Sequence, residues 1–132
     1  MTVFVILGSL FVFVAAVIHV LIFFMECITW SKPTTWKRFG LTSQADADTV
    51  KPMAFNQGFY NLFLAIGVGI GLIMIGSNVA GGVPIALFAA GSMVAAALVL
   101  LLSNRKLARA AIIQGAAPLL GIIFLVLALT TV

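Results

Sequence analysis

Four long apolar runs, separated by polar or glycine-rich segments, dominate the sequence. They extend over residues 2–30, 53–76, 83–103 and 107–131. Each run is long enough to cross the hydrocarbon core of a bilayer, which takes about 20 helical residues. Because backbone groups in lipid must find hydrogen bonds within the chain, helices are the expected form. The sequence therefore predicts an all-α integral membrane protein, with residues 1–132 forming a single four-helix transmembrane domain.

The composition supports this class and argues against two others. Of the 132 residues, 64% are hydrophobic and only 8% are charged. A small water-soluble domain needs far more polar surface than this. The formal net charge of +4 indicates basic connections at a membrane surface rather than binding to nucleic acid. The first run lacks a basic leading segment and a clear cleavage site, so it is expected to be a retained helix and not a signal peptide.

The positions of the basic residues predict how the chain is oriented. All seven lie in the first connection, in the third connection or at the start of the fourth run, and the second connection has none. Short connections make consecutive helices antiparallel neighbours. The positive-inside rule then places the first and third connections in the cytoplasm. We expect an antiparallel four-helix bundle with both termini outside.

A polar stripe runs along the first apolar segment. It contains the only histidine, His19, and the only acidic residue within a span, Glu26, seven residues later. On a helix these side chains point nearly the same way, roughly 10 Å apart along the axis. Trp30 follows Glu26 by four residues and continues the stripe. Because a carboxylate facing lipid is costly, the stripe is expected to face protein or a cavity.

A second polar group opens the next span, in the stretch FNQGFYN at residues 55–61. Counted from the inner surface, its side chains, Glu26 and a glutamine of the fourth run all fall in the cytoplasmic half of the bilayer. This shared depth predicts a pocket that opens inward. The candidate catalytic residues are His19, Glu26 and Tyr60, and the candidate substrate-binding residues are Trp30, Asn56, Gln57, Asn61 and Gln114.

Such a pocket suits acid–base chemistry on a small lipophilic molecule, such as an isomerisation or a hydration. A histidine and a glutamate in a low dielectric can exchange protons, and Tyr60 can donate to a developing oxyanion. Whether the chain is an enzyme stays open. No cofactor is expected, and no metal, because His19, Glu26 and Cys27 fall short of a good ligand set.

The same residues have simpler interpretations. His19 could be a packed core histidine, Glu26 could pair with Lys37 or Arg38, and the amides could be interhelical hydrogen bonds. Two other functions also remain open. One is a small proton-coupled carrier or channel, assembled as a homo-oligomer because four helices enclose little room. The other is an accessory subunit whose polar cluster docks a partner helix.

The segments HVLIFFMECITW and NQGFYNLFLAIG resemble a family of small bacterial four-helix membrane proteins without an assigned function. The resemblance covers essentially the whole chain. It implies four spans in a bacterial inner membrane and no particular reaction. The expected partners are membrane lipids and a small lipophilic ligand.

A fainter likeness is to sterol isomerases of the emopamil-binding type. These enzymes also gather His, Glu, Asn and Trp in a membrane cavity. The likeness is in residue types only, and this chain lacks a second carboxylate within its spans. It serves as an analogy and does not assign a reaction.

Overall fold

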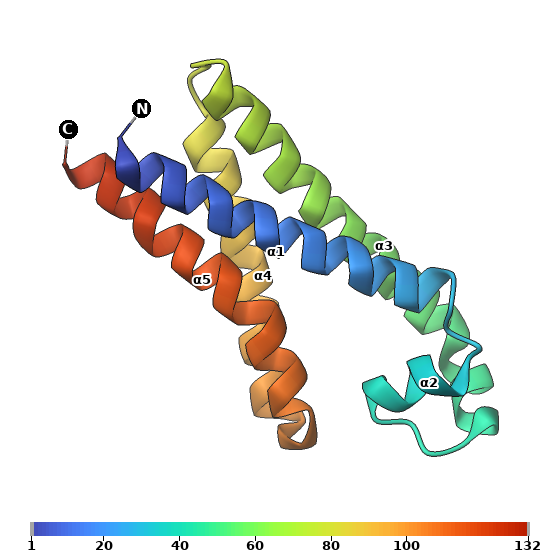
Figure 1. The fold of residues 1–132 in the computed structure, drawn as a ribbon. Helices are drawn as coiled ribbons and strands as arrows, with labels where there is room; N and C mark the ends of the chain where they lie inside the picture. Colours follow the sequence, from blue (N-terminus) through green and yellow to red (C-terminus); the bar gives the residue numbers. More distant parts are fainter. Residues whose placement is uncertain (1, 132) are drawn as a thin grey trace.

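The computed structural model describes residues 2–131, and these residues are mostly helical (Figure 1). Two short segments join the longer helices: α2 (Pro33–Trp36) with the 3-10 turn η1 (Lys37–Phe39), and the 3-10 turn η2 (Arg105–Leu107). Four helices are long and apolar enough to cross a membrane, as in a multi-pass membrane protein. They are α1 (Val3–Cys27), α3 (Gln44–Gly76), α4 (Gly82–Ser103) and α5 (Ala108–Thr130). At this level the predicted helical membrane protein is confirmed.

Helix α3 begins earlier than its apolar run. Ser43 caps it by accepting a hydrogen bond from the Asp46 backbone N–H, so the helix starts at Gln44 and not near Met53. Pro52 lies inside it rather than ending it. At 1.5 Å per residue the helix is about 50 Å long. The hydrocarbon core takes about 20 residues, so counting back from Gly76 places its boundary near Gln57.

The polar connection between α1 and α3 is folded into a small cap, which we call the tryptophan cap. The Trp30 Nε1–H donates to the Ala47 carbonyl at 2.9 Å, and the Trp36 Nε1–H donates to Gln44 Oε1 at 3.2 Å. Both indoles are buried. The cap consists of Trp30, Trp36, Ala47 and Ala54, with Phe39, Leu41 and Val50 packed against them. Aromatic rings with a polar edge suit the membrane–water boundary.

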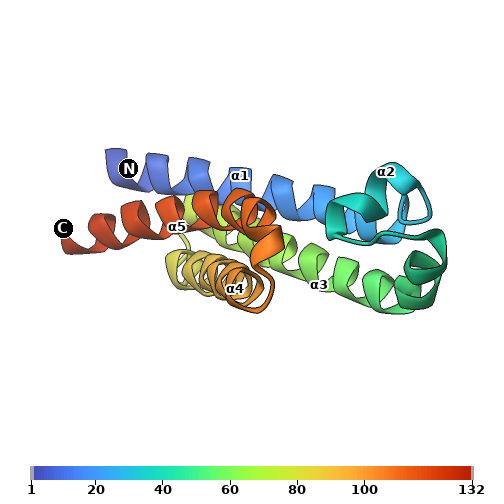
Figure 2. The same ribbon diagram turned by 90° about the horizontal axis from the view of Figure 1, so that it is seen from below.

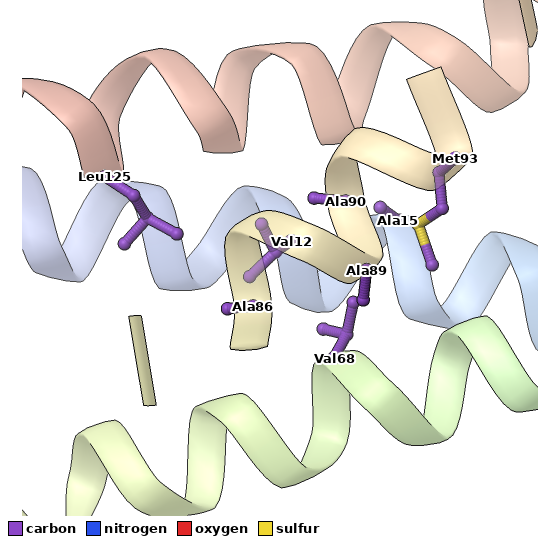
Figure 3. Packing of buried hydrophobic residues seen from close by; sticks show 8 residues of the cluster. All are labelled: Val12, Ala15, Val68, Ala86, Ala89, Ala90, Met93 and Leu125. Carbon is purple, nitrogen blue, oxygen red and sulfur yellow. The ribbon is translucent and has the colours of Figure 1, made fainter. Parts of the chain in front are cut away.

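The four long helices meet in one hydrophobic core (Figure 3). Helix α1 packs on α3 and α5, and α4 packs on the same two helices. Small residues bring the helices together: a Cβ added to Gly71 would lie 2.8 Å from the Ala86 backbone nitrogen. The core consists of Val12, Ala15, Val68, Ala86, Ala89, Ala90, Met93 and Leu125. Gly67, four residues before Gly71, also faces α4, since a Cβ added to it would lie 3.2 Å from Ala89 Cβ.

Beyond this core the helices separate into two pairs. The start of α1 and the end of α5 lie side by side, and the rings of Phe4 and Phe124 are 6.4 Å apart there. Toward the other end, α1 and α3 continue to the tryptophan cap, whereas α4 and α5 turn away toward η2 (Figures 1 and 2). The cap reaches across to the second pair at one point. A Cβ added to Gly40 would lie 3.5 Å from Leu107 Cδ2.

Candidate functional site

The structure brings Glu26 and Asn61 together at the interface of α1 and α3. Asn61 Nδ2 donates to Glu26 Oε2 at 3.0 Å and to the Gln57 carbonyl at 3.1 Å. Glu26 is only 9% exposed. Within residues 2–131 no donor reaches its other oxygen, Oε1, and no basic side chain pairs with it. The simpler interpretation in which Glu26 pairs with Lys37 or Arg38 therefore does not describe this structure.

Gly58 allows this contact because it has no side chain. A Cβ built on Gly58 would lie 3.1 Å from Glu26 Cβ and would collide with Cys27 Sγ. The Cys27 thiol in turn donates to the Phe55 carbonyl at 3.3 Å. Close approach of the two backbones is what brings the short Asn61 side chain within reach of the carboxyl group.

Aromatic side chains pack at the same α1–α3 interface. Phe23, three residues before Glu26, meets Phe59 edge to face with ring centroids 5.3 Å apart. Phe55 meets Phe59 in the same way at 5.1 Å. These contacts add van der Waals area where the two helices meet. Phe23 shares the polar face of α1 by its spacing, whereas sequence reasoning did not single out Phe55 and Phe59.

His19 lies two helical turns from Glu26 on the same face of α1. It is 2% exposed, and its Nδ1 lies 2.8 Å from the Ala15 carbonyl. Since a carbonyl can only accept, Nδ1 carries the proton and Nε2 is left as an acceptor. Nε2 has no hydrogen-bond partner among the described residues. The side chains of His19 and Glu26 share a direction but sit roughly 10 Å apart along the helix axis, so they do not act on one proton directly.

Asn56, Gln57 and Tyr60 do not face Glu26 as expected. All three are exposed, and Tyr60 is 55% exposed with its ring against Phe63. The reason is the separation of the helix pairs. Tyr60 precedes Gly67 by seven residues and lies on the same side of α3, but only Gly67 meets α4, at Ala89. Of the FNQGFYN motif, only Asn61 reaches the carboxyl group.

The two remaining candidates fall in different places. Trp30 is buried in the tryptophan cap, and its indole N–H donates to the Ala47 carbonyl, so this side chain does not line an open pocket. Gln114 is half-buried on α5. It precedes Gly121 by seven residues, and Gly121 packs against Val12 of α1, so Gln114 lies on the α5 face that meets α1.

The hollows on the surface are apolar and lie elsewhere. One of about 240 Å³ lies between α4 and α5, lined by residues that include Ala97 and Gly115. Another of about 350 Å³ lies between α1 and α3, lined by residues that include Val17 and Ala65. Neither of these two hollows includes a candidate site residue. In the described part of the chain, no three His, Cys, Asp or Glu side chains are grouped to hold a metal ion.

Comparison with known proteins places the chain in a family without giving it an activity. A sequence model of a family described as "Protein of unknown function (DUF1304)" matches residues 13–126. This segment includes His19, Glu26, the FNQGFYN motif and Gln114. No curated protein and no solved structure matches the chain. Because the match covers most of its length, the protein belongs to the DUF1304 family, whose function is unknown.

Proposed function

We propose that this protein binds a small lipophilic molecule within the membrane and holds its polar head at Glu26 and Asn61. The observation that carries the proposal is the half-satisfied carboxyl group. Glu26 is 9% exposed, and only Oε2 has a donor among residues 2–131, while Oε1 is not fully enclosed by the protein. In an apolar surrounding without water, a polar atom that lacks a partner costs about 1–3 kcal/mol, and more if charged. A ligand head bound at Oε1 would supply the missing partner.

The surroundings of the pair suit such a ligand. Gln57 and Tyr60 lie on the side of α3 from which α4 has separated, and Gln114 lies on the α5 face directed at α1. These side chains offer further donors and acceptors along the space between the helix pairs. The rest of the bordering surface is mostly aliphatic and aromatic, which fits an apolar tail. Ligand sites in membrane bundles are commonly built from a few polar groups on an apolar wall.

The orientation that we propose puts this site in the inner leaflet. The helices form an antiparallel bundle with both termini outside, because the basic residues of the first and third connections belong in the cytoplasm. The adjacent ends of α1 and α5 support this arrangement (Figure 1). We also propose a bacterial inner membrane as its location, which the resemblance to small bacterial proteins supports. A lipophile would then enter sideways from the inner leaflet.

Chemistry at this site would rest on Glu26 alone. Its carboxyl group is held by Asn61 at the α1–α3 interface, and His19 lies about two turns deeper in the core. An isomerisation or hydration would use Glu26 to give or take the proton, with Tyr60 and Asn61 orienting polar atoms. His19 would relay protons only through an intervening water or ligand atom.

A second candidate is docking of a partner helix, and the exposed amides favour it. Asn56 and Tyr60 are four residues apart and both exposed on α3, which makes a polar stripe within or close to the hydrocarbon region. Side chains of this kind hydrogen-bond across helices in membranes. Transport has less support, because the core of Val12, Ala15, Val68 and Met93 closes the bundle beyond the site.

Photo-crosslinking tests the proposal. The probe is a long-chain alcohol with a diazirine in its tail, added to the purified full chain in lipid nanodiscs. We expect labels on α3 and α5 near Tyr60 and Gln114, competed by the unlabelled alcohol and reduced in Asn61→Ala. Labelling that is not competed, and that reaches the lipid-facing Phe88 equally, would contradict the proposal. Crosslinks from the Tyr60 face to a second polypeptide would favour the docking alternative.

A further inference from the structure

We infer that the lipophile carries a positively charged head, and specifically a protonated amine on an apolar chain. The inference rests on the proposed function and names the ligand class of the same site. It follows from the charge that the chain leaves uncompensated between its helices.

The first step is the charge at the site. Glu26 is the only acidic residue within the membrane-spanning runs, and its single side-chain partner, Asn61, is neutral. In its ionised form this carboxyl group would be a buried charge, and buried charges in proteins are normally paired. An ammonium group at Oε1 would both donate a hydrogen bond and balance the negative charge. A hydroxyl group would donate a hydrogen bond but leave the charge unbalanced, and charge-assisted bonds are roughly twice as strong as neutral ones.

The second step is that the basic residues are placed elsewhere. Lys51 Nζ donates to Ser31 Oγ at 3.1 Å, and Lys37 Nζ lies 5.7 Å from the centre of the Trp36 ring. Both belong to the region of the tryptophan cap. Arg105, Lys106 and Arg109 are exposed at the other helix pair. Among the described residues none of the seven basic side chains, Lys32 and Arg38 included, pairs with Glu26, so a bound cation would be its only partner of opposite charge.

The third step is the aromatic border. Phe59 contacts both Phe23 and Phe55 at the same α1–α3 interface. Aromatic faces attract ammonium groups and the carbon atoms attached to them. A carboxylate head would be repelled by the Glu26 carboxylate, because two like charges in a low dielectric repel strongly. The site should therefore prefer the amine over the alcohol, and the alcohol over the fatty acid.

Three probes with one tail separate these heads: dodecylamine, dodecanol and dodecanoate. Each is added at neutral pH to the purified full chain in an uncharged detergent, and the bound fraction is measured by native mass spectrometry. We expect the wild type to bind dodecylamine about tenfold more tightly than dodecanol, a difference of about 1.4 kcal/mol. In Glu26→Gln the preference should fall to about one, while dodecanol stays bound.

The matched control is Asp48→Asn. It also removes one carboxylate, at an exposed position at the start of α3, and keeps an acceptor for Gln44. The amine preference should be unchanged in this variant. Retained dodecanol binding in Glu26→Gln shows that the variant is folded.

The outcomes divide cleanly. Equal binding of dodecylamine and dodecanol by the wild type overturns the inference and leaves the lipophile site standing. The inference is also overturned if Glu26→Gln still binds dodecylamine more tightly than dodecanol, or if the wild type binds dodecanoate most tightly. If none of the three probes binds, both the inference and the proposed function fail.

Discussion

Asn61 Nδ2 donates to Glu26 Oε2 at 3.0 Å across the interface of α1 and α3. Within residues 2–131 it is the only hydrogen bond that joins the side chains of two different membrane-spanning helices. Gln44 and Asp48 pair within the polar start of α3, and the Cys27 thiol of α1 donates to a backbone carbonyl of α3. The Glu26–Asn61 bond therefore fixes the register of α1 against α3 through two polar side chains.

Asn61→Ala should destabilise the protein more than the same change at the neighbouring amide Asn56. It leaves a buried carboxyl group without its donor, which costs about 1–3 kcal/mol. Asn56 is exposed and makes no side-chain bond among the described residues, so Asn56→Ala should stay within about 0.5 kcal/mol of the wild type. Equilibrium unfolding in mixed micelles measures both. Equal losses for the two variants would show that the Glu26–Asn61 bond is not a stabilising contact.

Gly58→Ala should be strongly destabilising because the added methyl group would collide with Cys27 Sγ. Overpacking of this kind costs about 1–3 kcal/mol. The matched control is Gly69→Ala in the same helix, where a Cβ meets nothing within 4 Å. It should be neutral or stabilising by up to about 1 kcal/mol, since alanine favours the helix.

Rescue tests the cause of the Gly58→Ala defect. Cys27→Gly in the Gly58→Ala background removes the group that the methyl would strike, so part of the lost thermal stability should return. A double variant that is as unstable as the sum of its single changes would place the collision elsewhere.

Trp30→Phe should loosen the tryptophan cap without disturbing the helix pair α4 and α5. The change keeps an aromatic ring against Phe39 but removes the side-chain donor to the Ala47 carbonyl. A lost bond of this kind costs about 1 kcal/mol. Hydrogen–deuterium exchange should rise in residues 31–50 and stay constant in 108–130. An equal rise in both segments would mean that the cap is not a separate unit.

The proposed orientation predicts which connections are reachable from outside the cell. Ser77 and Ser103 are both exposed, one after α3 and the other at the end of α4. In a Cys27→Ser background, Ser77→Cys should react with a membrane-impermeant maleimide in intact cells, and Ser103→Cys should react only after the cells are opened. The reverse pattern would place the basic connections outside and contradict the positive-inside assignment.

Much of the helical framework could be predicted from the sequence, because long apolar runs leave little choice in lipid. The placement of His19 and Glu26 on one buried face of α1 also followed from their spacing of seven residues. The start of α3 did not, because its first turns are polar and depend on the Ser43 cap and on a helix that continues through Pro52. A serine cap and a helix-internal proline indicate a helix start much more weakly than the change in hydropathy near Met53 does.

The exposure of Gln57 and Tyr60 could not have been predicted from their pattern. They were expected in a pocket because of their depth, and they do lie on the side of α3 that meets α4 farther along, at Gly67 and Gly71. At the level of these two residues α4 has diverged from α3 because the helices cross at an angle. The contact of Gly71 with Ala86, farther along α3, helps to set that angle. Crossing angles arise from packing between segments that are distant in the sequence. They therefore cannot be derived from the depth of residues along one helix.

The most direct test of the central claim is native mass spectrometry with lipid extraction on gently purified protein. Wild type is compared with Glu26→Gln and with the control Asp48→Asn. The account predicts one discrete lipophile that is retained by the wild type and by Asp48→Asn and depleted in Glu26→Gln. Bulk phospholipid alone, in equal amounts on all three proteins, would contradict the claim that Glu26 holds a ligand.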